Sequence, residues 1–163
     1  MKKLLISAGA VTALALSTPA FAANTATANA TVNIVSPLSL TKTADMDFGT
    51  IVGPFAGEDV ELDTSGNVAC PGTLTCSGSP TAAAFDVTGT PDQQLTLVIP
   101  ASVTLNGSVS GTLDVDLTTD LPADPLLDNT GAASFSLGGT LNIPNGTVDG
   151  VYSNTFNVTA NYQ

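Results

Sequence analysis

Acidic side chains are the most numerous of the chemically reactive or ligand-binding groups in this chain. Its 163 residues include 14 Asp and Glu, three Lys and Arg and no His, which gives a formal net charge of −11. Without histidine, neither an imidazole base nor a histidine-ligated metal site can form. Three basic side chains are too few to neutralise a phosphate backbone, which argues against nucleic-acid binding. The chemistry left to consider is that of carboxylates and of two cysteines.

The acids fall into two groups that could offer oxygen ligands to Ca²⁺, although neither has the spacing of an EF-hand loop. Asp114 and Asp116 lie on the solvent face of an expected strand, where acids confer solubility and block edge pairing. We favour that interpretation and expect no metal ligand and no cofactor. The stronger calcium candidate is the loop from Asp120 to Asp128, where Pro122 and Pro125 could fix the ligand geometry. The groups are Glu58, Asp59, Glu61 and Asp63, and Asp114, Asp116, Asp120, Asp124 and Asp128.

Catalysis finds little support in these residues. A carboxylate pair could serve a glycosidase, but the chain has few aromatic side chains on which a sugar would stack. Asp63-Thr64-Ser65-Gly66 is only superficially similar to an aspartic-protease loop, because one residue too many precedes the glycine. Serine and cysteine nucleophiles would lack a histidine base. We expect no catalytic residues and no enzymatic activity.

The first 22 residues have the three parts of a secretory signal peptide. Lys2 and Lys3 form a basic start, residues 4–16 an apolar run, and Ala20-Phe21-Ala22 a small-x-small cleavage site. The run is well short of the roughly 20 apolar residues that span a membrane. We expect cleavage after Ala22 and export to the periplasm, cell surface or extracellular space, with no membrane span after the signal is removed.

Two cysteines in an exported chain most simply form a disulfide. Cys70 and Cys76 enclose a Pro71-Gly72 pair that favours a chain reversal and could bring the two Cβ atoms together. A loop this short would contribute about 2 kcal/mol by chain-entropy reasoning. A redox-active pair is disfavoured, since the spacing is not C-x-x-C and no basic neighbour would activate a thiol.

Beyond residue 22, apolar and polar residues alternate and no useful length of helical periodicity occurs, which predicts β-strands. Leu113, Val115 and Leu117, for example, alternate with polar residues. Dense turn signals such as Asn106-Gly107 separate short runs, as in sandwiches and barrels. We expect an all-β fold in which residues 35–163 form a single immunoglobulin-like (Greek-key) β-sandwich, with a small closed barrel as the alternative.

Both ends of the mature chain alternate most regularly, and we expect extended strands there. Residues 23–34 form the N-terminal segment, whose second face carries Thr and Asn. Its apolar face, the expected assembly strand, consists of Ala26, Ala28, Ala30, Val32 and Ile34. The residues of the C-terminal segment that we expect to form the edge of a groove are Gly150, Tyr152, Phe156, Val158 and Tyr162.

The C-terminal segment resembles that of pilin subunits from the chaperone–usher pathway. Gly150 stands fourteenth from the end, apolar residues alternate after it, and Tyr162 is a penultimate aromatic. Over its full mature length the chain is more similar to the bacterial family catalogued as domain of unknown function 4402, which brings no established activity. That similarity is carried by Asp47-Phe48-Gly49-Thr50, Ala84-Phe85-Asp86-Val87-Thr88-Gly89, Gly138-Gly139-Thr140-Leu141, and Gly150-Val151-Tyr152 leading to Asn161-Tyr162.

The pilin resemblance implies donor-strand complementation, in which a sandwich lacking its last strand accepts the N-terminal extension of the next subunit. Residues 26–34 would be the donor, and residues 150–163 would border the groove, where a periplasmic chaperone could pair first. Such insertion does not close and so makes fibres. The protein would be a secreted structural or adhesive surface protein, a fimbria-like subunit partnered by itself or related subunits.

Two alternatives stay open. Residues 26–34 could be the first strand of their own domain, which we favour slightly over exchange between molecules. An alanine-rich donor face would bury little apolar area, at about 0.8 kcal/mol per CH₂ group, and the Cys70/Cys76 spacing is shorter than the bridge usual in pilins. The protein could also be a monomeric extracellular binding module that depends on calcium.

Overall fold

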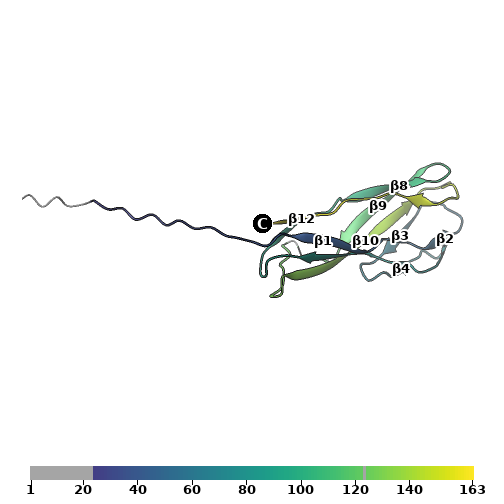
Figure 1. Cartoon of the computed structure of the whole chain (residues 1–163). Coiled ribbons are helices and arrows are strands. Elements are labelled where there is room, and N and C mark those ends of the chain that lie inside the picture. The colour runs from purple at the N-terminus through teal and green to yellow at the C-terminus, as the bar shows by residue number, and fades with distance from the viewer. Residues whose placement is uncertain (1–23, 123) are drawn as a thin grey trace, which may run out of the picture. The chain divides into compact units, whose positions relative to one another are not determined.

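The computed structural model describes residues 24–122 and 124–163 (Figure 1). The expected signal peptide, residues 1–22, lies outside the described residues. The described residues form strands and turns without any helix, which confirms the all-β prediction. Accordingly, no helix in this part of the chain could cross a membrane.

The chain divides into two units after Asn33. Residues 24–33 contain no strand, and their side chains are exposed. The strand that the alternation predicts over residues 26–34 is therefore not formed within the single chain. A strand becomes stable only when its N–H and C=O groups find a partner.

All strands among the described residues lie in the second unit, residues 34–163, which we call the domain. The strands are β1 (Ser39–Ala44), β2 (Thr50–Val52), β3 (Glu58–Leu62), β4 (Val68–Ala69), β5 (Thr75–Ser77), β6 (Ala83–Thr88), β7 (Leu95–Val98), β8 (Ser102–Gly107), β9 (Thr112–Thr119), β10 (Ala132–Ile143), β11 (Tyr152–Ser153) and β12 (Thr159–Tyr162).

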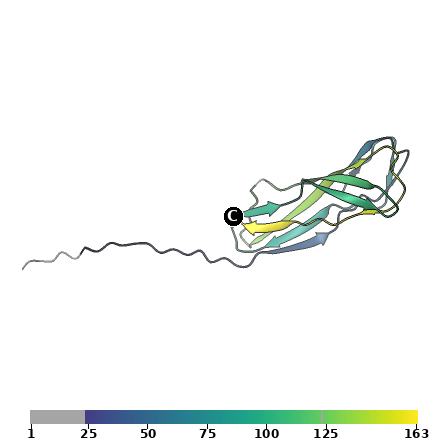
Figure 2. The ribbon, with the colours of Figure 1, turned by 90° about the horizontal axis from the view of Figure 1, so that it is seen from above.

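One curled antiparallel sheet contains most of these strands, in the order β1-β6-β10-β9-β8-β11, with β3 beside β10 and β4 beside β3. Two smaller antiparallel sheets pair β12 with β7 and β2 with β5. Figure 2 shows β12, in yellow, lying along its neighbour at the end that carries the C-terminus. The β8–β9 turn lies at the other end of the domain (Figure 1).

Strand β10 is the longest and changes partners along its length. Its first half pairs with β6, and its second half pairs with β9 on one side and β3 on the other. Gly138 and Gly139 stand where the change occurs. A Cβ atom at Gly138 would collide with the Leu62 carbonyl oxygen, and one at Gly139 would lie 2.8 Å from that of Asp116. The two glycines therefore let neighbouring strands approach β10 closely from both sides.

The core consists of two apolar clusters. The first joins β3, β8, β9 and the second half of β10, whereas the second joins β6, β7 and the first half of β10. Phe85 and Phe135 stack in the second cluster with ring centroids 5.1 Å apart. The buried members are Val60, Leu74, Val103, Leu113, Val115, Leu141 and Ile143 in the first, and Ala83, Phe85, Val87, Leu95, Leu127, Phe135 and Leu137 in the second.

Replacing Gly138 by alanine should destabilise the domain, because the new methyl group meets the backbone of β3. We expect the free energy of unfolding to fall by about 1–3 kcal/mol, the usual cost of forced overpacking. Gly72→Ala is the matched control, since nothing lies within 4 Å of a Cβ atom there. Urea denaturation of the three proteins measures the difference, and equal stability of both variants would contradict the close-approach argument.

Candidate functional site

The acidic side chains cap turns and bridge strands. The Asp63 carboxylate accepts hydrogen bonds from the backbone N–H groups of Ser65 (2.9 Å) and Asn67 (2.8 Å) and from the Asn67 side chain (2.9 Å). Asp128 closes an equivalent turn, with bonds from Thr130 N–H, Thr130 Oγ1 and Ala132 N–H. These bonds are formed within the loops and need no ligand.

Hydrogen bonding shifts the titration of both turn acids. The Asn67 side chain, followed by its backbone N–H, lowers the pKa of Asp63. The Thr130 hydroxyl, followed by the Ala132 backbone N–H, lowers the pKa of Asp128. Both carboxylates are solvent-exposed, and the hydrogen bonds that lower their pKa values are made within the two turns.

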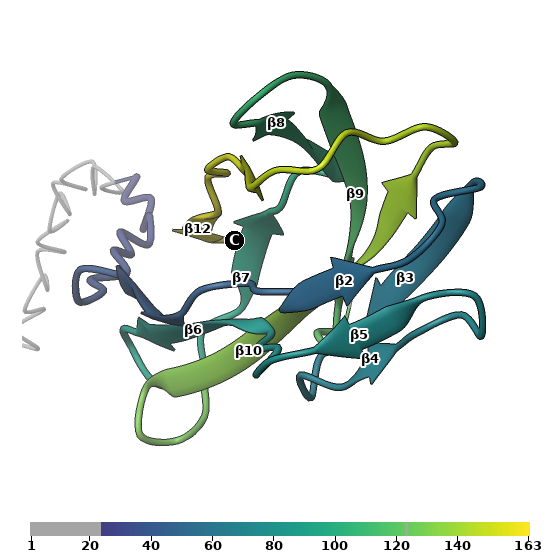
Figure 3. The ribbon, with the colours of Figure 1, turned by 90° about the vertical axis from the view of Figure 1, so that its right-hand side faces the viewer.

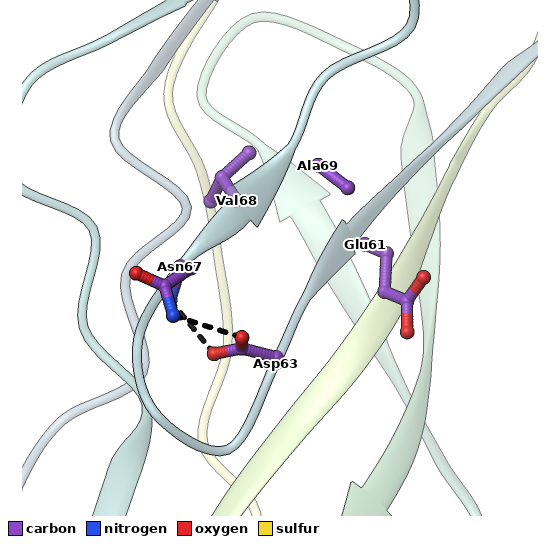
Figure 4. Close-up of a pocket in the computed structure, with 5 residues that line it drawn as sticks. All are labelled: Glu61, Asp63, Asn67, Val68 and Ala69. Carbon is purple, nitrogen blue, oxygen red and sulfur yellow. Dashed lines mark hydrogen bonds between the residues drawn. The ribbon is translucent and has the colours of Figure 1, made fainter.

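A shallow hollow lies beside the Asp63 turn (Figure 4), lined by Glu61, Asp63, Asn67, Val68 and Ala69. Asp63 faces Asn67 there, while Glu61 extends away from that pair. Asp114 and Asp116 lie exposed on β9, as predicted. Across residues 24–122 and 124–163, no three His, Cys, Asp or Glu side chains converge as metal ligands would.

The predicted disulfide between Cys70 and Cys76 is confirmed, with the two Cα atoms 6.0 Å apart. Inside its loop the Leu74 N–H donates to the Pro71 carbonyl oxygen (2.9 Å). Leu74 is buried in the first cluster, and both cysteines pack against that cluster. The bond therefore fixes the loop between β4 and β5, which carries the buried Leu74, onto the core.

The C-terminal segment forms one interrupted edge strand. Its first part, β11, pairs with β8, and its second part, β12, pairs with β7. The core-facing residues Phe156, Val158, Ala160 and Tyr162 all pack against the second cluster, yet all remain partly exposed. A strand with a neighbour on its other side would bury such residues more fully, as β10 buries Leu137.

Backbone groups of β12 point to the side that carries no neighbour. The Gln163 N–H donates to the Gln94 carbonyl oxygen (3.0 Å), so alternate residues from Gln163 backward bond to β7. The N–H and C=O groups of Tyr162 and Ala160 therefore face the free edge. Half-buried apolar side chains and unpaired backbone groups belong to the same residues.

Strand β1 also has a free edge, since it pairs with β6 alone among the described strands. Leu38 and Leu40 pack against the same second cluster as β12 and are also partly exposed. Lys42 stands opposite the buried Phe85 in the register, on the core-facing side, and its ammonium group pairs with Asp45. A lysine at this position of an edge strand discourages indiscriminate pairing.

Tyr162 fixes one end of these two edges. Its hydroxyl donates to the Ser36 carbonyl oxygen (2.8 Å) and accepts from the Thr90 N–H (2.7 Å). At the other end Met46, which follows β1, and Phe156, which precedes β12, both pack against both clusters. The edges of β1 and β12 thus border the same side of the core and run in opposite directions. We call this side the open seam; it is bordered by Leu38 and Leu40 at one edge and by Val158, Ala160 and Tyr162 at the other. Figure 3 views the domain end-on and shows β12 beside β7.

The expected groove residues thus come together, apart from Gly150 and Tyr152, which lie with β11 at the far end of the domain. The expected assembly residues Ala26, Ala28, Ala30 and Val32 lie in the separate unit of residues 24–33, and Val32 is 83% exposed. Ile34, at the start of the domain, is 84% exposed. Sequence reasoning did not identify Leu38 and Leu40 as the facing edge, although their alternation was the available signal.

Asp63 and Asp128 should make the domain more stable near neutral pH than in acid. Because their pKa values are lower in the folded protein, the stabilisation is complete above the unfolded pKa, near 3.8, and is lost as the pH falls through the folded values. Asp63→Asn with Asp128→Asn should therefore flatten the fall in urea midpoint from about pH 5 downward. An unchanged pH slope in the double variant would contradict this role.

Tyr162→Phe should loosen the fixed end of the open seam, because it removes two hydrogen bonds to the backbone. We expect a loss of about 1–3 kcal/mol in the free energy of unfolding, at 0.5–1.5 kcal/mol for each bond. Urea denaturation measures it, with the exposed Gln163→Ala as control. A Tyr162→Phe variant as stable as that control would show that the bonds do not hold the end.

Comparison with known proteins identifies a family. The family model described as "Domain of unknown function (DUF4402)" matches residues 38–162, which include every strand from β1 to β12. No curated protein and no solved structure matches the chain. The matched region covers the open seam on both sides, from Leu38 to Tyr162, and confirms the similarity to this family that the sequence motifs indicated. The chain belongs to the DUF4402 family.

Proposed function

We propose that the protein is an exported structural or adhesive surface protein whose copies assemble by strand complementation. Residues 26–34 of one copy would pair with the open seam of another, alongside β12 and β1. The observation that carries this proposal is the seam itself: two free edges at opposite ends of the chain border one partly exposed apolar cluster.

The two parts match in chemistry. The seam offers apolar side chains together with backbone groups that lack a neighbour, which is what an added strand requires. Residues 26–34 alternate apolar and polar side chains without a break and carry no charge. Their N–H and C=O groups have no ladder partner within residues 24–33. Pairing would satisfy both sets of groups at once.

The finer fold assignment belongs to the same proposal. We infer an immunoglobulin-like (Greek-key) sandwich that lacks a strand at the open seam, similar to pilin subunits of the chaperone–usher pathway. Supporting this, β1 and β6 pack across the second cluster from β7 and β12. A periplasmic chaperone would be the first partner of the seam after export, and no catalytic role is proposed.

Val32→Asp tests the pairing, because the substitution would place a carboxylate against the apolar cluster when the strand inserts. We expect association of the mature protein, residues 23–163, to weaken by about tenfold or more, which corresponds to about 1.4 kcal/mol. Light scattering after size-exclusion chromatography measures the polymer mass. The stability of the single domain should not change, since Val32 is 83% exposed and lies outside the domain.

Thr31→Asp is the matched control, with the same charge added one position earlier on the polar face. Its polymers should resemble those of the unaltered protein. Equal effects of the two substitutions, or a mature protein that stays monomeric at all concentrations, would contradict strand complementation. A monomer would instead favour the extracellular binding module.

A further inference from the structure

The open seam imposes a direction on whatever strand fills it. β1 runs from the Ser36–Tyr162 end toward Met46, whereas the C-terminal segment runs from Tyr152 toward Tyr162. A strand laid between them must be antiparallel to one edge and parallel to the other. That choice decides at which end of the receiving domain the donor's own domain lies.

The connection between donor strand and donor domain is short. Ser36 is fixed to its own domain, with its N–H donating to Thr90 Oγ1 (2.6 Å) and its carbonyl oxygen accepting from Tyr162. Only Val35 separates Ile34 from that anchor, so Ser36 lies within about 10 Å of the end of the donor strand. Two copies joined in this way must touch where the donor strand ends.

The two directions give different assemblies. A donor strand of residues 26–34 spans about 30 Å, close to the length of residues 154–162. If it ran parallel to β12, it would end beside Tyr162, and both copies would meet by the same end and could close a two-fold dimer. If it ran antiparallel to β12, it would end beside β11, and the second domain would lie against the opposite end.

That opposite end carries an exposed apolar patch, the valine patch, formed by Val109, Val148 and Val151. They are 73%, 45% and 71% exposed, respectively. Hydrogen bonds hold the patch together: the Ser108 N–H donates to the Val151 carbonyl oxygen (2.8 Å), and the Val151 N–H donates to Ser108 Oγ (3.0 Å). Within the two loops that form this end, residues 107–111 and 144–151, the only charged side chain is that of Asp149.

We infer that the donor strand inserts antiparallel to β12 and that the valine patch packs against the beginning of the next copy's domain, around Val35 and Pro37. This rests on the proposed strand complementation and adds its polarity and its second contact surface. The short connection fixes where the second domain lies, and the exposed valines provide an independent apolar surface at that place. Copies joined in this way form an open, head-to-tail series.

Val109→Asp combined with Val151→Asp tests the contact in the mature protein. Both positions are exposed in the single domain, so the melting temperature should stay within error of the unaltered protein. Association measured by light scattering should weaken by about tenfold or more. Val98→Asp is the matched control, because Val98 is 58% exposed on β7, away from the patch, and its polymers should be unaltered.

Paired cysteines test the direction. With a short thiol cross-linker, Ile34→Cys plus Ser153→Cys should give a ladder of covalent oligomers, whereas Ile34→Cys plus Gln163→Cys should give none between molecules. A ladder from the second pair alone, or covalent dimers as the largest species, would overturn the inferred polarity.

Deletion of residues 23–34 distinguishes the valine-patch contact from the strand complementation on which it rests. Polymers that survive the deletion would overturn strand complementation itself. Polymers that are lost on deletion but unaffected by the Val109 and Val151 substitutions would overturn only the valine-patch contact.

Discussion

An edge strand of a β-sheet presents N–H and C=O groups that no neighbour satisfies, and in this domain two such edges border one apolar cluster. On β12 the residues with outward-facing backbone groups are the same residues whose side chains are half-buried, Ala160 and Tyr162. On β1 the equivalent side chains are Leu38 and Leu40. Water satisfies the backbone but leaves the apolar surface exposed, so an added strand would bury apolar area at the seam.

The rest of the domain holds that seam in place. Strand β10 links the two core clusters, and its paired glycines allow β3 and β9 to approach it closely. The Cys70–Cys76 bond fixes the loop between β4 and β5 onto the first cluster. Tyr162 joins the last strand to the backbone just before the first one, so the seam has a fixed end although its edges are unpaired. Lys42, on the core-facing side of β1, makes that edge less open to unrelated strands.

The sequence predicted features that local spacing determines. Alternation located β9 and its outward acids Asp114 and Asp116, and the Pro-Gly turn predicted the disulfide. Alternation also marked the core-facing residues of the C-terminal segment, but not its division into β11 and β12, because that depends on which part pairs with β8 and which with β7. Over residues 26–34 the same pattern predicted a strand that the single chain does not form, since alternation reports a fitting surface and not the presence of a partner.

Features that join distant parts of the chain were not visible in the sequence. The tie between Tyr162 and Ser36 spans 126 positions, and nothing in either residue's neighbours indicates it. Leu38 and Leu40 alternate with polar residues, but nothing near them in the sequence indicates which strand they pair with. Pairing of β1 with β6 is a long-range contact, and it places these leucines at an edge of the seam.

Amide hydrogen exchange at Ala160 and Tyr162 tests the open seam most directly. Their N–H groups face the free edge, so they should exchange rapidly in a variant lacking residues 23–34 and slowly in the mature protein at concentrations where it assembles. Asn161, which bonds to β7, should be protected in both. Equally slow exchange at Ala160 and Tyr162 in the deletion variant would show that these groups already have a partner within the domain and that there is no open seam.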